Sequence, residues 1–386
     1  MFRAFSLQAF AAGILAAFVG FASSFAVVVK GLQGVGASPA EAASGLMAIS
    51  VAMGLCAIYL SLRTRLPISI AWSTPGGALL ASSAALDGGF AAAVGAFIVT
   101  GVLLFLAGLW KPLGRWVAAI PAPLANAMLA GVLLSLCLAP VRAVALSPWL
   151  ALPIIIAWAL VARWKRLYAV PAALLVAMVV IGFSLRGSAV QLGPLWPAPL
   201  FITPLFTPAA LIGVAVPLFI VTMASQNIPG LAVLHANNYR PEPGPLFQAT
   251  GIATVAAAPF GSHAMNLAAI TAAICAGPDA HPDPARRYWA AAVAGAMYIV
   301  FGLLAGVATA FIAASPPLLV ETVAGLALLG AMGSSLMGAM KEEGSREAAL
   351  ITFLVAASGL TLFGIGGAFW GLIAGGLVLA LSRFRP

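Results

Sequence analysis

The chain has 386 residues, of which 63% are hydrophobic and only 7% are charged. Because a soluble domain carries about 25% charged residues, a soluble protein of this composition would expose far too much apolar surface, and the sequence predicts an integral protein of a lipid bilayer. The net charge of +9 does not indicate a nucleic-acid partner, because the basic residues are scattered between apolar stretches and form no patch.

Apolar segments follow one another along the whole chain. Since a membrane-spanning helix needs about 20 apolar residues, we expect an all-α integral membrane protein with about 14 transmembrane segments, several of them short. The first is interpreted as a retained helix, because its apolar run continues to Val29 and is too long for a cleaved signal peptide. The predicted segments lie at residues 7–29, 41–61, 67–85, 89–109, 121–139, 148–162, 167–184, 208–235, 245–258, 262–276, 287–313, 317–340, 347–363 and 367–382.

The basic residues orient these segments, because Lys and Arg favour cytoplasmic loops. With the N-terminus inside, all 18 basic residues fall in cytoplasmic turns or tails except Lys30, Arg142 and Arg186. A wrong number of segments would scramble this alternation. We therefore predict that both termini are cytoplasmic.

Short motifs recur in the same order in the two halves of the sequence. "AAAVGAFIVTG" (91–101) resembles "AAAVAGAMYIVFG" (290–302), and "PLANAMLAG" (123–131) resembles "PLLVETVAG" (317–325) with the same Pro-to-Gly spacing. Because about seven segments separate equivalent positions, an odd number, the halves would have opposite orientations in the membrane. The pattern predicts a 7+7 inverted repeat of roughly seven segments per half.

The third and tenth segments are unusually short and polar. "LPISIAWSTPGGALLASSAAL" (66–86) and "APFGSHAMNLAAITAAICAG" (258–277) each begin with an extended-looking stretch and end in a short apolar helix. Non-helical backbone is tolerated at membrane depth only beside protein or a watery cavity. Interrupted segments in corresponding halves indicate the binding site of a transporter; the alternative is a pair of loops that merely end short helices.

Two half-helices at the midplane would form an anion site. Their N-termini, predicted at Gly76–Gly77 and at Ser262–His263, would present unpaired N–H groups and positive dipole ends, with Ser73 and Thr74 just before the first of them. Gln226 and Asn227 on the eighth segment, and Asn266 on the tenth, add neutral donors. Helix–helix hydrogen bonding is their alternative role. The centre contains no pair of carboxylates, so it favours a small anion with an apolar body.

Two residues are candidates for proton coupling. His263 changes charge near neutral pH, and an ionisable group inside the membrane indicates a function; its alternative role is to brace the crossing of the extended stretches. Glu321 lies about one turn into the twelfth segment and has a competing interpretation, as a carboxylate that caps the helix or reaches the outer interface.

Nothing in the sequence indicates an enzyme. Cys56, Cys137 and Cys275 lie inside apolar runs without metal-ligand spacing, and we find no nucleophile–base set. The glycines of "FGIGGAFWGLIAGG" (363–376) are better interpreted as close helix packing than as a phosphate loop. We expect no cofactor and no metal.

Three stretches carry a resemblance to a known family. "SQNIPGLAVLHANNYRP" (225–241), "APFGSHAMNLAAITAAICAG" (258–277) and "HPDPARRYWAA" (281–291) closely resemble the benzoate–proton symporter (BenE) family of bacterial inner membranes. That family is similar in fold to nucleobase–ascorbate and sulfate-type transporters. The resemblance implies short antiparallel strands in segments 3 and 10, and a homodimer formed through the gate. It also implies a core domain at 1–110 and 208–314 and a gate domain at 111–207 and 315–386.

The resemblance implies proton-coupled uptake of benzoate or a related aromatic carboxylate by alternating access, with H⁺ as the coupling ion. The aromatic ring would lie against residues such as Phe260, Met265 and Trp72. A nucleobase transporter is disfavoured, because related nucleobase carriers have glutamates where this chain has Gln226 and Ser262 or His263. Transport of another small anion, such as sulfate or a dicarboxylate, and an anion channel remain alternatives. The candidate binding residues are Ser73, Thr74, Gly76, Gly77, Gln226, Asn227, Phe260, Gly261, Ser262, His263, Met265 and Asn266.

Overall fold

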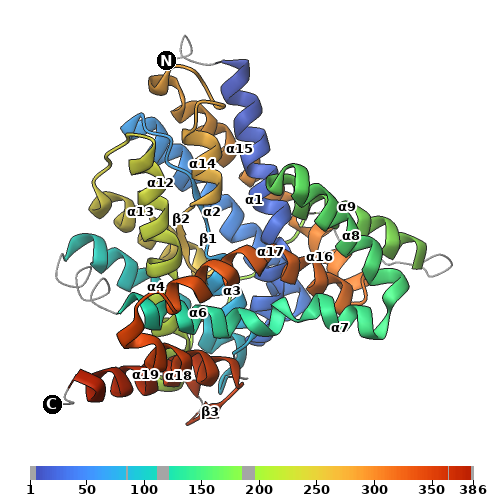
Figure 1. Cartoon of the computed structure of the whole chain (residues 1–386). Coiled ribbons are helices and arrows are strands. Elements are labelled where there is room, and N and C mark those ends of the chain that lie inside the picture. The colour runs from blue at the N-terminus through green and yellow to red at the C-terminus, as the bar shows by residue number, and fades with distance from the viewer. Residues whose placement is uncertain (1–5, 84–85, 111–120, 185–195, 364, 384–386) are drawn as a thin grey trace.

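The computed structural model describes residues 6–83, 86–110, 121–184, 196–363 and 365–383, and it is dominated by helices (Figure 1). Arg186, one of the exceptions to the predicted orientation, lies outside these residues. Among the described residues, seven helices are long and apolar enough to cross a membrane, and a pair bent by 53° (Pro284–Leu303 with Ala305–Ala314) would make an eighth. The prediction of a helical, multi-pass membrane protein is therefore confirmed.

The first half of the chain begins with the long helix around which the molecule is built. A long helix, α1, passes through the middle of the molecule and packs against α3, α15 and α2. The elements of the first half are α1 (Leu7–Gly34), α2 (Pro39–Thr64), β1 (Ile70–Trp72), α3 (Thr74–Ala81), α4 (Gly89–Leu109), α6 (Ala122–Cys137), α7 (Ala139–Leu146), α8 (Pro148–Trp164) and α9 (Ala169–Ser184).

The second half has a similar order of elements, but its first long segment is irregular. Helices α10, α11 and α12 form one continuous segment that is interrupted by two π-helical turns, Leu211–Ala215 and Met223–Asn227. The elements are α10 (Pro208–Ala210), α11 (Val216–Thr222), α12 (Ile228–Ala236), α13 (Pro243–Ala257), β2 (Met265–Leu267), α14 (Ile270–Ala276), α15 (Tyr288–Leu303), α16 (Ala305–Ala314), α17 (Pro317–Ala339), α18 (Arg346–Ala357), β3 (Thr361–Leu362), β4 (Ile365–Gly366) and α19 (Gly367–Arg383).

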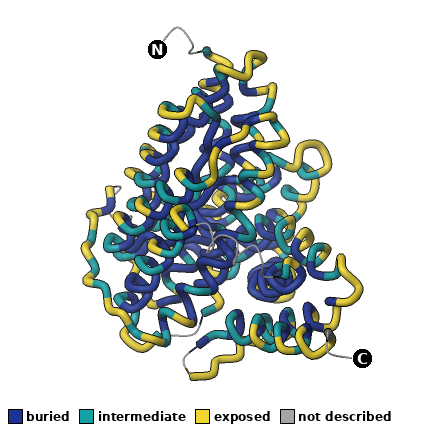
Figure 2. Tube along the Cα trace, turned by 90° about the vertical axis from the view of Figure 1, so that its left-hand side faces the viewer, coloured by how far each residue is buried: buried dark blue, intermediate teal, exposed yellow. Residues whose placement is uncertain are grey.

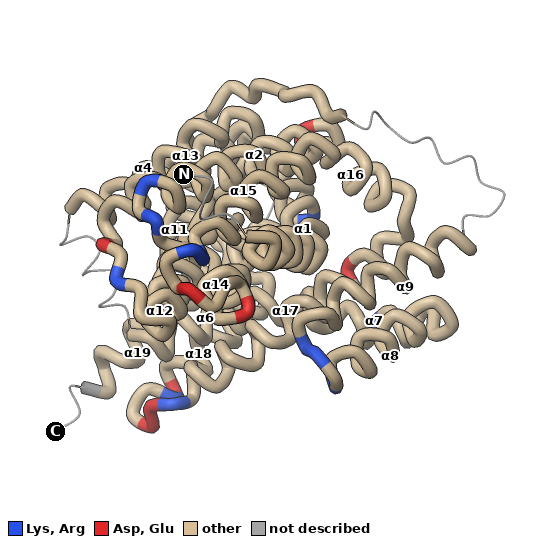
Figure 3. The backbone as a smooth tube through the Cα atoms, turned by 90° about the horizontal axis from the view of Figure 1, so that it is seen from above, with Lys and Arg blue, Asp and Glu red and all other residues tan. Residues whose placement is uncertain are grey.

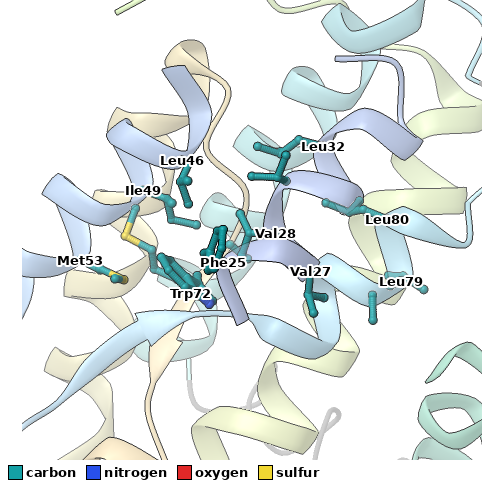
Figure 4. Close-up of a cluster of buried hydrophobic side chains, with 14 of the residues drawn as sticks. Phe25, Val27, Val28, Leu32, Leu46, Ile49, Met53, Trp72, Leu79 and Leu80 are labelled. Atoms are coloured by element: carbon teal, nitrogen blue, oxygen red, sulfur yellow. The ribbon is translucent and has the colours of Figure 1, made fainter. Parts of the chain in front are cut away.

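Buried residues fill the interior and exposed residues lie mostly on the outside (Figure 2); many of the exposed residues are large and apolar. Figure 4 shows side chains of α1, including Val28 and Leu32, in a cluster with Leu46 and Ile49 of α2 and with Leu80 of α3. Charged residues are few and lie in short groups along the backbone, separated by long uncharged stretches (Figure 3). An apolar exterior with sparse charge suits helices that face lipid.

The tightest helix pairs meet at glycines. A Cβ at Gly54 of α2 would collide with the carbonyl oxygen of Gly295 of α15, and the reverse substitution is equally obstructed. Gly101 of α4 and Gly251 of α13 meet in the same way. Small residues let helix backbones approach closely, which is the main source of packing energy between helices in lipid. The α2–α15 and α4–α13 contacts are the most extensive in the molecule.

Segments 3 and 10 each contain a short strand followed by a short helix. Strands β1 and β2 pair antiparallel, with Ile70 opposite Leu267, Ala71 opposite Asn266 and Trp72 opposite Met265. This pairing confirms the strands and half-helices that we expected in these segments. The described residues also contain a second small hairpin, β3–β4, which the sequence analysis missed. Close packing of the glycine-rich stretch is confirmed, since Gly371 and Gly375 lie against α18.

One part of the prediction for segment 10 is wrong. Ser262 and His263 do not lie at the head of a half-helix, because α14 begins only at Ile270. The pairing of Met265–Leu267 with β1 requires extended backbone. The helix can therefore start only after the strand, several residues later than the polar residues suggested.

Candidate functional site

The two short strands form the centre of the candidate site, which we call the crossing (residues 69–74 and 263–268). Its ladder extends beyond the strands, since Ser73 N donates to the Ala264 carbonyl at 2.9 Å and Ala268 N donates to the Ser69 carbonyl at 3.0 Å. The Ser69 and Thr271 hydroxyls are 2.7 Å apart and close one end. Backbone polar groups inside the membrane must be satisfied internally, and the crossing achieves this without a continuous helix.

Ser73 caps the N-terminus of α3. Its side-chain oxygen accepts a hydrogen bond from Gly76 N at 3.1 Å and another from the Thr222 hydroxyl at 3.0 Å. The hydroxyl is fully buried and is engaged in holding α3 against α11. Thr74, the first residue of α3, is half-buried and lies at the accessible edge of this helix end.

Replacing Ser73 by alanine is expected to lower the free energy of unfolding by about 1 kcal/mol, the usual cost of losing an N-cap. Ser82→Ala at the other end of α3 is the matched control, because its hydroxyl bonds only the nearby Leu79 carbonyl. Thermal unfolding of the purified variants in detergent measures both effects. Equal melting temperatures for the two variants would contradict the capping role of Ser73.

Gly76 and Gly77 serve helix packing in this structure. A side chain at Gly76 would collide with Leu218 of α11. The Gly77 backbone lies so close to Gly31 of α1 that a Cβ at Gly31 would strike its carbonyl. These two glycines therefore set the distance of α3 from its neighbours, while Thr74 is the more accessible of the predicted residues at this helix end.

Gln226 and Asn227 lie in the π-helical turn that precedes Pro229. Asn227 is fully buried, and its Oδ1 accepts a hydrogen bond from Leu267 N of β2 at 2.9 Å. Asn227 thus provides the acceptor for an N–H group on the outer edge of β2, where no further strand among the described residues pairs with it. This matches its alternative role as a structural hydrogen-bonding residue. Gln226 is half-buried. π-turns inside helices are frequently found at functional sites.

His263 follows a tight turn that is held by α2. Gly261 has φ +89°, a conformation that favours glycine, and the Ser44 hydroxyl of α2 donates to the Phe260 carbonyl at 3.0 Å. Ser262 Oγ donates to the carbonyl of His263 at 3.1 Å. The turn places the imidazole inside the molecule, fully buried, with its ring 6.4 Å from that of Phe97 of α4.

Both ring nitrogens of His263 lack a hydrogen-bond partner among the described residues. A buried polar group without a partner costs about 1–3 kcal/mol, so its retention indicates a role beyond packing. Continuing the strand register by two residues from Trp72 and Met265 places His263 opposite Thr74. The imidazole therefore belongs to the same end of the crossing as the N-terminus of α3.

Of the remaining predicted residues, Met265, Asn266 and Trp72 belong to the crossing, whereas Phe260 lies outside it. Met265 and Asn266 are fully buried in β2; Asn266 Nδ2 donates to the Leu267 carbonyl at 2.9 Å, while its Oδ1 has no partner among the described residues. Trp72 donates to the Ser24 hydroxyl at 2.8 Å. Phe260 instead stacks edge-on against Phe201, with ring centroids 5.9 Å apart, and is thereby engaged in packing with the loop that carries Phe201.

Several hydroxyl residues that hold the crossing were missed by the sequence analysis. Thr254 of α13 accepts a hydrogen bond from Met265 N at 3.1 Å, and Thr222 and Thr271 bond the two serines that flank β1. Buried Ser and Thr within apolar helices are the available signal, because such residues commonly hydrogen-bond across helices in membranes.

Glu321 lies away from the crossing and forms an ion pair. Its carboxylate is 3.1 Å from Lys30 Nζ of α1, with side-chain exposures of 33% and 21%. The contact joins α1 to α17 and explains why Lys30 departs from the predicted charge pattern, since its charge is balanced locally. A half-exposed pair of this kind contributes roughly 0–1 kcal/mol to stability.

The sequence of the chain matches the family described as benzoate membrane transport protein (BenE) over residues 3–381. The chain belongs to this family. It is 42% identical over 369 residues to inner membrane protein YdcO of Escherichia coli, covering 95% of this chain and 93% of the relative. It is 32% identical over 373 residues to the benzoate membrane transport protein of Acinetobacter baylyi, covering 96% and 94%. This member of the BenE family is a membrane transporter and not an enzyme.

The fold is similar to that of solved anion transporters. The transmembrane domain of the cyanobacterial bicarbonate transporter BicA matches with a TM-score of 0.59 at 16% identity, covering 97% of this chain and 98% of that domain. SLC26A9 matches with a TM-score of 0.62 at 13% identity, covering 97% of this chain and 66% of that protein. At such low identity the likeness establishes a shared fold for this BenE-family chain.

Proposed function

We propose that this protein takes up benzoate or a closely related aromatic carboxylate by proton-coupled symport and alternating access. The observation that carries the proposal is the buried crossing, where the N-terminus of α3, the unpartnered imidazole of His263 and the half-buried Gln226 come from three separate segments. Family membership and the name of the Acinetobacter relative support benzoate as the substrate. H⁺ is the coupling ion, and no cofactor takes part.

The substrate carboxylate lies at the N-terminus of α3 in this proposal, beside Thr74. The helix dipole and the Thr74 hydroxyl stabilise an anion there, because the N–H groups of Gly76 and Gly77 are already bonded to Ser73. Gln226 contributes a neutral donor. Among the described residues, no carboxylate lies at the crossing to repel the anion, and the carboxylate of Glu321 is already paired with Lys30. Ser262 and Gly261 act through the backbone turn that positions His263.

A 7+7 inverted repeat, with 14 transmembrane segments, underlies the proposed transport cycle. Helix contacts support it because they occur in matched pairs related by an exchange of the two halves: α2–α15 with α4–α13, and α8–α9 with α18–α19. The α6–α17 contact is its own counterpart. Residues 1–110 and 208–314 form a core domain that moves against a gate domain of residues 111–207 and 315–386.

The proposed setting is the bacterial inner membrane, with both termini cytoplasmic and two copies associated through the gate. The Escherichia coli relative is named as an inner membrane protein, which supports this location. The long apolar helices also support a position within a bilayer.

Uptake of labelled benzoate into proteoliposomes tests the proposal. We expect accumulation that grows with an imposed inward proton gradient, and competition by unlabelled benzoate but not by sulfate. Competition by sulfate alone would assign another anion to the site, and equilibration without accumulation would indicate a channel. His263→Ala is expected to remove the dependence on the gradient, while His235→Ala, an exposed histidine, serves as its control.

His263 carries the coupling proton in this proposal, and Glu321 is the second candidate. The Lys30 partner separates the two, because Lys30→Met would leave Glu321 without its counter-charge. If Glu321 carries the proton, Lys30→Met and Glu321→Gln must both shift the pH dependence of uptake. We expect neither variant to shift the pH dependence of uptake. We also expect the free energy of unfolding to change by no more than about 1 kcal/mol in either variant. A shifted pH profile would transfer the role to Glu321.

A further inference from the structure

A groove lies away from the crossing, on the outer face of α2 and α13. This groove has a volume of about 1000 Å³, and its walls are formed by one side of each helix. Leu55, Tyr59 and Ile252 are more than half exposed there, with 55%, 61% and 57% of their surface accessible. A groove of this size with apolar walls holds a molecule that is itself largely apolar.

The charges of the groove are confined to one end. Arg63 near the end of α2, Arg240 before α13 and Glu242 next to α13 line the mouth, while the opposite end is lined by alanines, Ala52 and Ala256. Neither arginine forms an ion pair with any residue in the described part of the chain. Two positive charges and one negative charge leave the mouth with a net positive charge.

The length of the groove matches one leaflet of a bilayer. Its walls on α2 run from Ala52 to Arg63, and eleven helical steps of about 1.5 Å give roughly 16 Å. The hydrocarbon core of a bilayer is about 30 Å thick, so half of it is about 15 Å. A chain that starts at the arginines therefore reaches the midplane at the level of Ala52.

We propose that this groove binds one anionic phospholipid from the leaflet on the arginine side. The headgroup phosphate contacts Arg63 and Arg240, and an acyl chain lies between α2 and α13. Arginine pairs with phosphate through a rigid fork of donors, whereas a zwitterionic headgroup cancels most of this attraction. Because α2 and α13 both belong to the proposed core domain, the lipid would travel with the half of the molecule that carries the crossing.

Native mass spectrometry of the purified full-length protein tests the proposal. We expect phosphatidylglycerol to stay bound at concentrations at which phosphatidylcholine with the same acyl chains dissociates. The double variant Arg63→Ala/Arg240→Ala is expected to bind phosphatidylglycerol about 30-fold more weakly, equivalent to about 1 kcal/mol for each arginine. Arg163→Ala/Lys165→Ala, an exposed basic pair at the end of α8, is the matched control and should leave binding unchanged.

A second pair of variants tests the acyl chain. Ala256→Trp fills the apolar end of the groove without changing its charge, and we expect it to weaken phosphatidylglycerol binding; Ala232→Trp, on an exposed face of α12 outside the groove, should not. Equal affinity for the two lipids, or unchanged binding after loss of both arginines, would overturn the proposal. Displacement of the lipid by glycerol phosphate alone would overturn it as well. The proposal would also be overturned if the protein formed a dimer that excludes the lipid and if Ala256→Trp abolished that dimer. That result would assign the groove to a second copy of the chain.

Discussion

Replacing Gly45 by alanine is expected to destabilise the protein strongly and to lower benzoate uptake. Alanine normally stabilises a helix relative to glycine by about 1 kcal/mol, but a Cβ at Gly45 of α2 would collide with the backbone carbonyl of Gly261. That carbonyl belongs to the turn that positions Ser262 and His263. Backbone cannot move aside as a flexible side chain can, and overpacking of this kind costs about 1–3 kcal/mol or more.

Gly376→Ala is the matched control for Gly45→Ala. Gly376 also lies in a helix, α19, but a Cβ there would have no atom within 4 Å. Melting temperature, yield of monodisperse protein and benzoate uptake should all fall for Gly45→Ala and stay at or above wild-type values for Gly376→Ala. A stable and active Gly45→Ala protein would show that α2 does not hold this turn.

Asn227→Leu is expected to destabilise the protein by about 1–3 kcal/mol, because it leaves the N–H group of Leu267 buried without an acceptor. Leucine is close to asparagine in size, so the loss is mainly that of the hydrogen bond. On its outer edge, β2 would then be held, within the described part of the chain, only by the hydrogen bond from Met265 N to Thr254, and uptake should fall along with stability.

The control for this change is Asn237→Leu, just after the C-terminal end of α12 in the same segment. The Asn237 amide donates to the Val233 carbonyl within its own helix turn and supports no strand. Thermal unfolding and uptake measured side by side distinguish the two positions. Loss of uptake in Asn227→Leu with an unchanged melting temperature would assign Asn227 to substrate contact and would contradict its structural role.

Hydrophobic patterning was sufficient to predict the membrane class and the approximate segments of this chain. The extent of each helix follows from the length of its apolar run, and Pro, Gly and polar residues mark the interruptions at segments 3 and 10. The likeness of the two halves indicated that these interruptions belong together. The two interruptions do lie together, because their strands β1 and β2 pair with each other.

The start of α14 could not be predicted from local sequence. "NLAAITAAICAG" (266–277) favours a helix from its first residue, but Asn266 and Leu267 are held extended by β1, which comes from the other half of the chain. Ala264 and Ala268 are recruited in the same way, through backbone groups that carry no side-chain signature. Long-range pairing thus overrides helix propensity in this stretch.

Individual side-chain roles were harder to predict than their location. Asn227 and Gln226 are neighbours with similar chemistry, yet one is fully buried against β2 and the other is half-buried. Successive side chains on a helix point in directions about 100° apart, so only one of the two amides faces β2. The sequence indicated irregularity at Pro229 but not the direction in which each amide would point.

The pairing of β1 with β2 also has a consequence for how the protein is made. Ser69 and Thr271 meet across the crossing although 202 residues separate them in the chain. During synthesis, the third segment therefore enters the membrane long before its partner strand exists, with N–H and carbonyl groups that lipid cannot satisfy. Until the second half emerges from the ribosome, these groups must stay in contact with water, the insertion machinery or a chaperone. Membrane insertion of the third segment is thus completed only when the tenth arrives.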